Sequence, residues 1–325
     1  MTGSRRADGA AVGDSWPRLD LSTWEGTLDT LHLWTQIVGK VRLALAPMVN
    51  HWWQVALYVT ARGLTTSLMP VRTRGLEMQF DFVDQRLHLL TTDGDARHLD
   101  LRSCSIADFY AETMEALGAL GVHVPMFARP VEVAVSIPFA EDTEVRPYDP
   151  HAGRQYWLAL VQASRVMAAF RGGFVGKSSP VHYFWGAPDL AVTRFSGRPA
   201  PRHRGGVPHC PDWVQELAYS HELSSCGFWA GGSEEGSFYS YAYPEPEGFR
   251  DRPVTPADAS FDHELGEFVL PYAAVRTADD PDAALLSFFE STYDAAADLG
   301  LWDRAALETR FPDSGMPDEM RRTSA

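Results

Sequence analysis

Four side chains in one aromatic-rich stretch of the sequence are suited to acid–base chemistry: His182, Asp189, His221 and Glu222. Imidazole changes its charge near neutral pH, and a carboxylate can orient it or exchange a proton with it. His221 and Glu222 are adjacent, so on a strand only one of them can face a given pocket. We expect the two histidines to transfer protons or bind ligands, with the two carboxylates as their catalytic partners.

Three cations in the same stretch predict where a charged ligand would bind. Guanidinium groups near a cleft hold carboxylate or phosphate through paired hydrogen bonds. We therefore expect Arg194 and Arg198 to clamp an anionic group, with Lys177 as a further substrate-binding residue. A purely structural ion pair between Asp189 and Arg194 is the alternative for this arginine.

Aromatic residues surround these charged groups. Tyr239, Tyr241 and Tyr243 alternate along one predicted strand, so their hydroxyl groups would converge on one face. Such residues can line a pocket for a planar or apolar ligand, although most aromatic residues in strands belong to the core. We expect Trp185, Trp229 and Tyr241 to contact the substrate, and burial in the core is the alternative.

Metal binding and covalent catalysis have weaker support. Imidazole and carboxylate groups suit iron, manganese or zinc, and the candidates are His182, Asp189, His209, His221, Glu222 and His263. None of their spacings is diagnostic, so we assign no metal ligands and leave metal assistance open. The serines lack the GxSxG motif of a hydrolase, and nothing marks Cys210 or Cys226 as reactive.

Helices and strands in the first part of the chain form one predicted unit. Apolar residues at helical spacing predict helices at 25–46 and 105–120. Runs of β-branched and aromatic residues predict strands at 52–60, 64–69, 76–83, 86–91 and 97–101. Alternating apolar residues predict one more strand at 131–137.

The second part of the chain repeats this order. Helices are predicted at 152–171 and 282–299, with strands at 181–185, 189–195, 217–223, 226–229, 237–243 and 267–271. The stripe Ile106, Phe109, Thr113, Leu117 of one closing helix aligns with Leu285, Phe288, Thr292, Ala296 of the other. We therefore predict an α+β fold of two similar units, an internal duplication in which helices pack on a mainly antiparallel sheet. The crevice between the halves is the expected ligand site.

These units define the expected boundaries. We expect a flexible tail at 1–19, a first unit at 20–140, an acidic linker at 141–150, a second unit with the site at 151–303 and a charged tail at 304–325. The first unit retains His51 but few acidic partners, so we expect it to be the structural half.

Composition restricts the class of protein. The chain has 325 residues, of which 45% are hydrophobic and 22% charged, typical of a folded globular protein. A net charge of −15 disfavours nucleic acid as a partner. The most apolar stretch is interrupted by Gln36, Lys40 and Arg42, so we expect no membrane span. Arg5-Arg6 lacks a following apolar segment and the three cysteines form no CxxC pair, so the cytoplasm is the expected compartment.

Six motifs carry a resemblance to a known family: Asn50–Trp53, Gly63–Thr66, Gly176–Arg198, Ala218–Gly232, Phe238–Pro246 and His263–Phe268. In these motifs the chain resembles DUF5996, a bacterial domain-of-unknown-function family, over roughly residues 20–308. The resemblance implies no particular activity, substrate or cofactor.

Together these features give two expectations for function. The first is a cytoplasmic enzyme that acts on a small anionic or polar-aromatic metabolite by His/carboxylate acid–base chemistry, with or without a metal. The alternative is a non-catalytic small-molecule-binding or regulatory protein that uses the same crevice. A scaffold or homodimer with a structural polar motif is a third possibility, and the cofactor and oligomeric state stay open.

Overall fold

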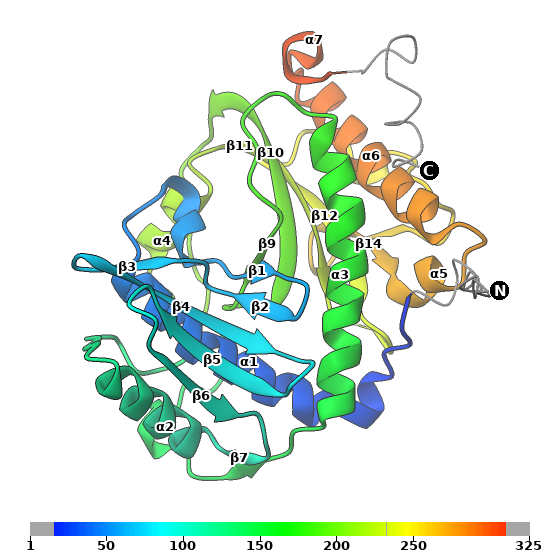
Figure 1. Cartoon of the computed structure of the whole chain (residues 1–325). Helices are drawn as coiled ribbons and strands as arrows, with labels where there is room; N and C mark the ends of the chain where they lie inside the picture. Colours follow the sequence, from blue (N-terminus) through cyan, green and yellow to red (C-terminus); the bar gives the residue numbers. More distant parts are fainter. Residues whose placement is uncertain (1–15, 232, 310–325) are drawn as a thin grey trace, which may run out of the picture.

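Helices and antiparallel strands make up the fold in a computed structural model that describes residues 16–231 and 233–309 (Figure 1). The strands form two six-stranded sheets and one two-stranded sheet, and every pairing between named strands is antiparallel. The predicted α+β class with mainly antiparallel sheets is therefore confirmed.

The first sheet has the strand order β1-β2-β4-β5-β6, with β3 paired to β4. Its strands are β1 (Tyr58–Val59), β2 (Gly63–Thr65), β3 (Met69–Val71), β4 (Arg74–Asp81), β5 (Arg86–Thr91) and β6 (Ala96–Asp100). Helices α1 (Leu21–Leu45) and α2 (Ile106–Ala119) contact each other and this sheet. The Ser105 hydroxyl accepts a hydrogen bond from the Asp108 N–H at 3.0 Å, which caps α2 where the sequence predicts its start.

The second sheet has the strand order β13-β14-β12-β11-β10-β9. Its strands are β9 (His182–Phe184), β10 (Asp189–Pro199), β11 (His221–Trp229), β12 (Ser237–Tyr243), β13 (Ser260–Asp262) and β14 (Glu267–Pro271). Helices α3 (Pro150–Gly172) and α6 (Pro281–Leu299) pack against β10, β11 and β12 (Figure 1). Side chains alternate along β10, so one set of residues faces these helices and the other set faces away from them.

Short elements complete the described chain. They are η2 (Asn50–Val55), β7 (Cys104–Ser105), η3 (Phe139–Glu141), β8 (Val145–Arg146), α4 (Asp212–Ala218), η4 (Phe249–Asp251), α5 (Tyr272–Arg276) and α7 (Arg304–Leu307). Strands β7 and β8 pair with each other, which ties the segment around 141–150 to the start of α2. Strand β8 thus lies inside the stretch expected to be a linker.

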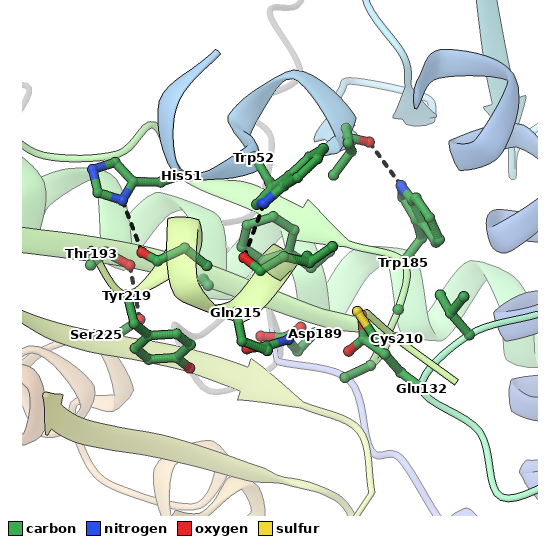
Figure 2. A pocket seen from close by; sticks show the side chains of 18 of the residues that line it. His51, Trp52, Glu132, Trp185, Asp189, Thr193, Cys210, Gln215, Tyr219 and Ser225 are labelled. Atoms are coloured by element: carbon green, nitrogen blue, oxygen red, sulfur yellow. Dashed lines mark hydrogen bonds between the residues drawn. The ribbon is translucent and has the colours of Figure 1, made fainter. Parts of the chain in front are cut away.

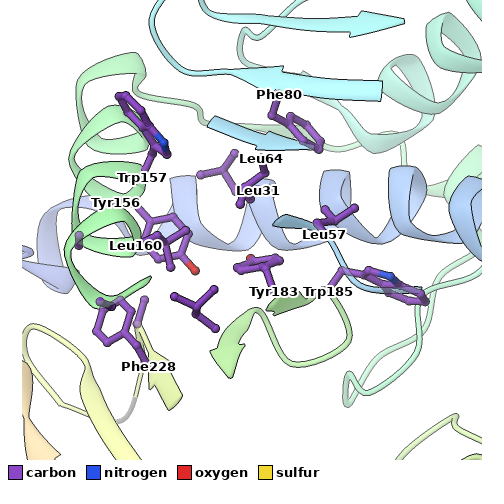
Figure 3. Close-up of a cluster of buried hydrophobic side chains, with 14 of the residues drawn as sticks. Leu31, Leu57, Leu64, Phe80, Tyr156, Trp157, Leu160, Tyr183, Trp185 and Phe228 are labelled. Atoms are coloured by element: carbon purple, nitrogen blue, oxygen red, sulfur yellow. The ribbon is translucent and has the colours of Figure 1, made fainter. Parts of the chain in front are cut away.

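One continuous cluster of buried side chains includes residues from both halves of the chain (Figure 3). Leu31, Leu57 and Phe80 come from the first half, and Tyr183 and Phe228 come from the second. Leu57 and Tyr183 also exchange backbone hydrogen bonds, each of 2.8 Å. The sheet that carries the predicted site is therefore fixed to the first half by both packing and hydrogen bonds.

Three predicted strands differ from the structure. Residues 52–55 belong to η2, because His51 and Trp52 have φ values of 57° and 63° that turn the chain, and only the short strand β1 forms later in the predicted range 52–60. Residues 131–137 form no strand: the Val131 N–H donates to the Gln36 side chain at 2.8 Å instead of to a neighbouring strand. Residues 217–223 contain the end of α4 and the start of β11.

The aligned stripes of α2 and α6 are both buried, as predicted. Thr113 and Thr292 occupy matching positions, and their hydroxyls donate to the carbonyls of Phe109 and Phe288 at 2.7 and 2.9 Å. Such i to i−4 bonds are common for buried helical threonines. The structure therefore shows two similar helices, and it does not show the predicted duplication.

Parts of both expected tails lie within the described residues. Trp16 and Leu19 are buried, and the Trp16 ring lies 5.8 Å from that of Tyr272. At the other end, the Val175 N–H donates to the Leu307 carbonyl at 2.8 Å, so α7 is held against the second half. The rest of these tails, 1–15 and 310–325, lies outside the described residues. No helix in the described ranges has both the length and the apolarity needed to cross a membrane.

Candidate functional site

A cavity of about 850 Å³ lies on the face of the second sheet that points away from α3 and α6 (Figure 2). Alternate residues of neighbouring strands form its floor: Asp189, Ala191, Thr193 and Phe195 of β10, Leu223, Ser225 and Trp229 of β11, Tyr239 and Tyr241 of β12, and Glu267 of β14. The period-two alternation of strands brings these side chains to one surface. The volume is that of a small-molecule site.

The other walls of the cavity come from segments that are distant in sequence. Lys40 of α1, residues of η2, the stretch 127–132 and residues 209–219 around α4 face the floor. Trp52 links two of these segments, because its indole N–H donates to the Val214 carbonyl at 3.0 Å (Figure 2). The first half of the chain therefore contributes directly to the site, contrary to the expectation of a purely structural half.

The backbone around this cavity is strained. Eight non-glycine residues in the described ranges have positive φ, and four of them line the cavity: His51, Trp52, Glu132 and His209. Left-handed backbone is unfavourable for bulky side chains, and strained residues often occur at functional sites. The concentration of strain here supports a functional use of the cavity.

Three carboxyl groups gather at one end of the cavity, and their surroundings disfavour ionisation. Burial raises the pKa of Asp189 to about 7, and the nearby Glu132 carboxyl raises it further. Burial likewise raises the pKa of Glu267 to about 7 and raises that of Glu132. Near neutral pH Asp189 and Glu267 can therefore both hold and release protons.

Tyr239 positions the Asp189 carboxyl. Its hydroxyl donates a hydrogen bond to Asp189 Oδ2, which opposes the effect of burial and lowers the pKa of this carboxyl. The end of the Tyr239 ring lies against Gly227, where a Cβ atom would be 2.3 Å from both Cζ and the hydroxyl oxygen. Glycine at 227 thus makes room for the contact between Tyr239 and Asp189.

His51 and a set of hydroxyls form the opposite end (Figure 2). His51 Nδ1 lies 2.8 Å from the Ala218 carbonyl, so it carries the proton and donates it, while Nε2 accepts from Lys177 Nζ at 2.6 Å. Burial lowers the pKa of His51, and the charge of Lys177 lowers it further. His51 is therefore held as a neutral imidazole beside the Thr193–Ser225 hydroxyl pair, whose oxygens are 2.9 Å apart.

Four of the ten predicted site residues line the cavity: Asp189, Trp185, Trp229 and Tyr241. Trp185 is fixed by its indole N–H, which donates to the Val55 carbonyl at 2.8 Å. The Tyr241 hydroxyl lies 2.9 Å from that of Tyr219. The expected convergence of Tyr239 and Tyr241 on one face is observed, whereas Tyr243 instead donates to the Pro201 carbonyl at 3.0 Å.

His182 is buried away from the cavity. It is completely inaccessible to solvent, and within the described residues neither ring nitrogen has a hydrogen-bond partner. Burial lowers its pKa to about 3, so the ring is neutral, and Phe184 packs on it with ring centroids 4.3 Å apart. A side chain so enclosed cannot reach a ligand in the cavity, and the structure does not support the proton-transfer role expected for it.

Arg194 faces the opposite side of the sheet from Asp189. The two residues are five positions apart on β10, so alternation separates them, and the alternative of an ion pair between them is wrong. The Arg194 guanidinium lies 3.5 Å from the Phe170 ring centroid and 4.3 Å from that of Tyr293, under α3 and α6. This arginine stabilises the packing of helices on the sheet and is not placed to bind an anion in the cavity.

The remaining predicted residues lie outside the cavity lining. Arg198 pairs with Glu222 at 2.6 Å and donates to the carbonyls of Gly300 and Leu301, so it holds the end of α6. His221 does not line the cavity, but its ring centroid lies 5.6 Å from that of His51, which does. Lys177 is not part of the lining, but its Nζ contacts three lining residues: it donates to His51 and lies 5.7 and 5.0 Å from the ring centroids of Trp53 and Phe195.

Sequence reasoning missed most of the polar residues that the cavity contains. These are Lys40, His51 as a site residue, Glu132, Cys210, Gln215, Tyr219 and Glu267. Glu267 had a usable signal, because it lies in the motif His263–Phe268 and begins a predicted strand. Lys40 and Glu132 had none, since they reach the site from a helix and a loop that no local pattern connects to it.

A metal centre is not formed by these groups as placed. Within residues 16–231 and 233–309, no cluster of three or more His, Cys, Asp or Glu side chains could hold a metal ion. The six metal-ligand candidates of the sequence are thus not brought together. His182 lies on the edge strand β9, paired with β10, whereas His221 lies on β11, on the other side of β10.

The fold and the cavity define a class: an α+β protein with an aromatic-lined cavity that contains carboxyl groups of raised pKa. The chain belongs to DUF5996, a family of unknown function whose model matches residues 16–309. The resemblance seen in the sequence motifs is therefore confirmed. No curated protein and no solved structure matches the chain.

Proposed function

We propose that this protein is an enzyme that binds a small polar-aromatic molecule in the cavity and transfers protons to or from it through Asp189. One observation carries the proposal: a carboxyl group with a pKa of about 7 lies on the floor of an aromatic cavity of about 850 Å³. Carboxyl groups tuned toward neutral pH in apolar clefts are typical of general acids and bases.

The lining favours a polar-aromatic ligand over an anionic one. Trp52, Trp185, Trp229 and Tyr241 provide broad aromatic surfaces for a planar molecule. Asp189, Glu132 and Glu267 would repel an anion when they ionise, and both predicted arginine clamps lie elsewhere. We therefore retain acid–base chemistry on a polar-aromatic metabolite. In this proposal Asp189 is the carboxyl group that exchanges the proton, and His51 replaces the buried His182 as the histidine.

The rim of the cavity supports entry of an apolar molecule. Phe127, Trp213 and Leu265 line the cavity and are 67%, 59% and 55% exposed. Large apolar side chains that are exposed together at a concave surface are typical of ligand-binding sites. A ligand with an aromatic body would bury this surface as it enters.

Binding can be tested with a panel of small aromatic phenols, amines, aldehydes and acids. Tryptophan fluorescence and thermal unfolding report binding, because Trp52, Trp185 and Trp229 line the cavity. We expect members with a hydrogen-bond donor or carbonyl to bind and Asp189→Asn to weaken them by about tenfold, the loss of a charge-assisted hydrogen bond. Asp279→Asn, on the exposed surface, is the matched control.

Turnover separates the enzyme from the alternative, a non-catalytic binding or regulatory protein in the same cavity. Incubation of the protein with a bacterial metabolite extract, followed by mass spectrometry, should show depletion of a compound that Asp189→Asn leaves intact. Thermal stabilisation by a compound that is never consumed would establish the non-catalytic alternative. If no compound of the panel or the extract binds, the proposal is wrong.

Two further expectations continue as proposals. The cytoplasm is supported by Cys104, Cys210 and Cys226, which are all free thiols. An internal duplication is supported by the shared order of helix, antiparallel sheet and helix, and by the matching threonine bonds of α2 and α6. In that view, the first unit keeps a closed sheet surface and the second unit carries the cavity.

A further inference from the structure

The chain contains only two lysines, Lys40 and Lys177, although Lys and Arg together number 28. Both are at the cavity: Lys40 lines it, and Lys177 contacts His51, which also lines it. Arginine keeps its proton in proteins, whereas the amine of lysine can lose its own. The chain therefore uses arginine for nearly all its cations and places its two titratable amines at this one site.

Lys40 is buried without a direct partner. It is 3% exposed, and its Nζ lies 5.5 Å from the Phe127 ring centroid and 5.6 Å from that of Trp185. Glu132 and Cys210 raise the pKa of Lys40 through their charges, but neither forms a hydrogen bond with it in the described part of the chain. A buried amine that has aromatic neighbours and faces a cavity is available to a ligand.

The wall beside this amine is rigid. The Trp185 indole packs against Gly39, where any Cβ atom would overlap the ring, and its N–H donates to the Val55 carbonyl at 2.8 Å. The residue next to Lys40 in α1 is thus a glycine that admits the indole. The apolar surface around the amine is in place before a ligand arrives, as preorganised sites require.

Burial lowers the pKa of Lys40 to about 8, against the opposing effects of the Cys210 thiol and the Glu132 carboxyl. At pH 7 this shift raises the fraction of neutral amine by roughly 300-fold over an ordinary lysine. Lysines desolvated in apolar pockets are the ones that act as nucleophiles toward carbonyl compounds.

We propose that Lys40 is a nucleophilic amine that forms an imine with an aldehyde or ketone bound in the cavity. This inference rests on the proposed function and specifies the class of its substrate. The assignment needs no metal and no redox partner, because an amine and a carbonyl give an imine and one molecule of water.

The steps balance with groups already in the cavity. The neutral Nζ attacks the carbonyl carbon, the C=O π electrons move to oxygen, and a proton passes from nitrogen to that oxygen. A protonated carboxyl then donates a proton to the resulting hydroxyl, which leaves as water while the nitrogen lone pair forms the C=N bond. Glu132 suits this step because it interacts with Lys40 and burial raises its pKa, and it regains a proton as the iminium nitrogen loses one.

Reductive trapping tests the inference. The full-length protein is incubated at pH 7 with 2-naphthaldehyde, treated with sodium borohydride and mapped by peptide mass spectrometry. Borohydride converts an imine into a stable secondary amine at the lysine that formed it. With only two lysines and the terminal amine as sites, we expect at least about tenfold more adduct at Lys40 than at either of the others.

Variants make the result specific to one amine. Lys40→Arg keeps a cation and Lys40→Met keeps an apolar chain of similar length, and both should lose the adduct while unfolding at a temperature close to that of the parent. Lys177→Arg is the matched control and should keep the Lys40 adduct. Because the mapping on the unmodified sequence needs no variant, a misfolded variant would not obscure the answer.

The outcomes separate this inference from the proposed function. Equal labelling of all amines, or no adduct at Lys40 while 2-naphthaldehyde quenches tryptophan fluorescence, would overturn the role of Lys40 and leave the binding site intact. If neither 2-naphthaldehyde nor its non-carbonyl analogue 2-naphthalenemethanol binds, both the inference and the proposed function are wrong.

Discussion

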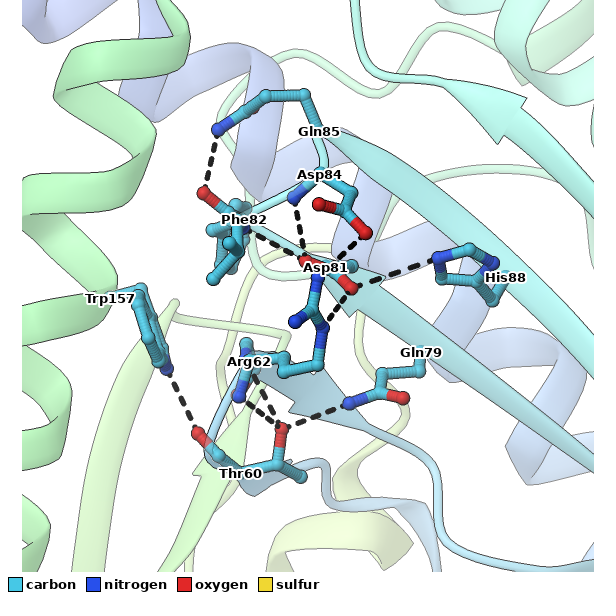
Figure 4. Close-up of polar contacts among 11 residues, drawn as sticks. Thr60, Arg62, Gln79, Asp81, Phe82, Asp84, Gln85, His88 and Trp157 are labelled. Atoms are coloured by element: carbon cyan, nitrogen blue, oxygen red, sulfur yellow. Dashed lines mark hydrogen bonds and ion pairs between the residues drawn. The ribbon is translucent and has the colours of Figure 1, made fainter.

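Two aspartates, one in each large sheet, occupy opposite electrostatic environments. Asp81 at the end of β4 is 2% exposed, yet it pairs with Arg62, lies 3.7 Å from His88 Nε2, and accepts from the N–H groups of Val83 and Asp84 at 2.8 and 2.9 Å (Figure 4). Asp189 at the start of β10 accepts a hydrogen bond from the Tyr239 hydroxyl, and no cation within residues 16–231 and 233–309 pairs with it. Asp81 is buried and Asp189 is half-buried, and both lie on antiparallel sheets.

The difference shows how burial changes the pKa of a carboxyl group when cations and N–H donors stabilise its charge and when they do not. At Asp81, burial would raise the pKa, but the Arg62 guanidinium and the two N–H donors outweigh it and lower the pKa. At Asp189 burial dominates and the pKa rises to about 7. The first carboxylate stabilises a turn of the fold, whereas the second costs stability when it ionises, as groups kept for chemistry often do.

The largest effect is expected at Asp81, where Arg62 and two N–H donors offset the cost of burial. Asp81→Asn removes the charge that pairs with Arg62 and weakens both backbone hydrogen bonds, so we expect a loss of about 3 kcal/mol in the free energy of unfolding at pH 7. Urea denaturation measures it. Asp84→Asn, which affects only the more exposed partner of Arg62, should cost under about 1 kcal/mol. Equal losses for the two variants would contradict the role given to Asp81.

A smaller effect of opposite sign is expected at the second aspartate. Asp189 has a folded-state pKa of about 7, above its ordinary value of 3.8, so the folded protein loses stability as pH rises from about 4 to about 7. Asp189→Asn removes this loss, and we expect it to stabilise the protein by about 2.5 kcal/mol more at pH 8 than at pH 5, where only the first part of the loss has occurred. Urea denaturation at both pH values provides the measurement. A variant that is destabilised equally at pH 5 and pH 8 would show that Asp189 is ionised throughout.

The smallest effect is expected when the side-chain donor of Asp189 is removed. Tyr239→Phe deletes the hydroxyl that favours the carboxylate form, so the pKa of Asp189 should rise further, by about one unit or less. The stability change should stay within about 1 kcal/mol, as for a single hydrogen bond. Tyr243→Phe removes a hydroxyl of the same strand that lies outside the cavity, and it should leave the pKa of Asp189 unchanged. A fall in the pKa of Asp189 in Tyr239→Phe would contradict the assignment of donor and acceptor.

Helices and strands of this fold could be predicted where a single segment carries a periodic pattern of apolar residues. Strands β5, β12 and β14 and helices α2 and α6 follow periodic patterns within single segments, and the structure places them within a few residues of the prediction. The helix η2 was missed because its β-branched and aromatic residues favour a strand, while the left-handed backbone at His51 and Trp52 depends on contacts with α4.

The site was predictable only in part, for the same reason. Asp189, Trp185 and Tyr241 were found because strands concentrate them in one stretch of sequence. Arg194 was misplaced although the alternation of β10 already puts it on the opposite face from Asp189. Lys40 and Glu132 approach from a helix and a loop, and only the three-dimensional structure brings them to the cavity.

The central claim is that Asp189 is a cavity carboxyl that exchanges its proton near neutral pH while Asp81 stays ionised. Carbon-13 NMR of protein labelled at the aspartate side-chain carboxyl, with Asp189→Asn and Asp81→Asn to assign the two signals, measures both titrations in one experiment. We predict a midpoint near pH 7 for Asp189 and a midpoint below the ordinary value of 3.8 for Asp81. A midpoint below pH 5 for Asp189, or coincident titration of the two carboxyls, would contradict the account.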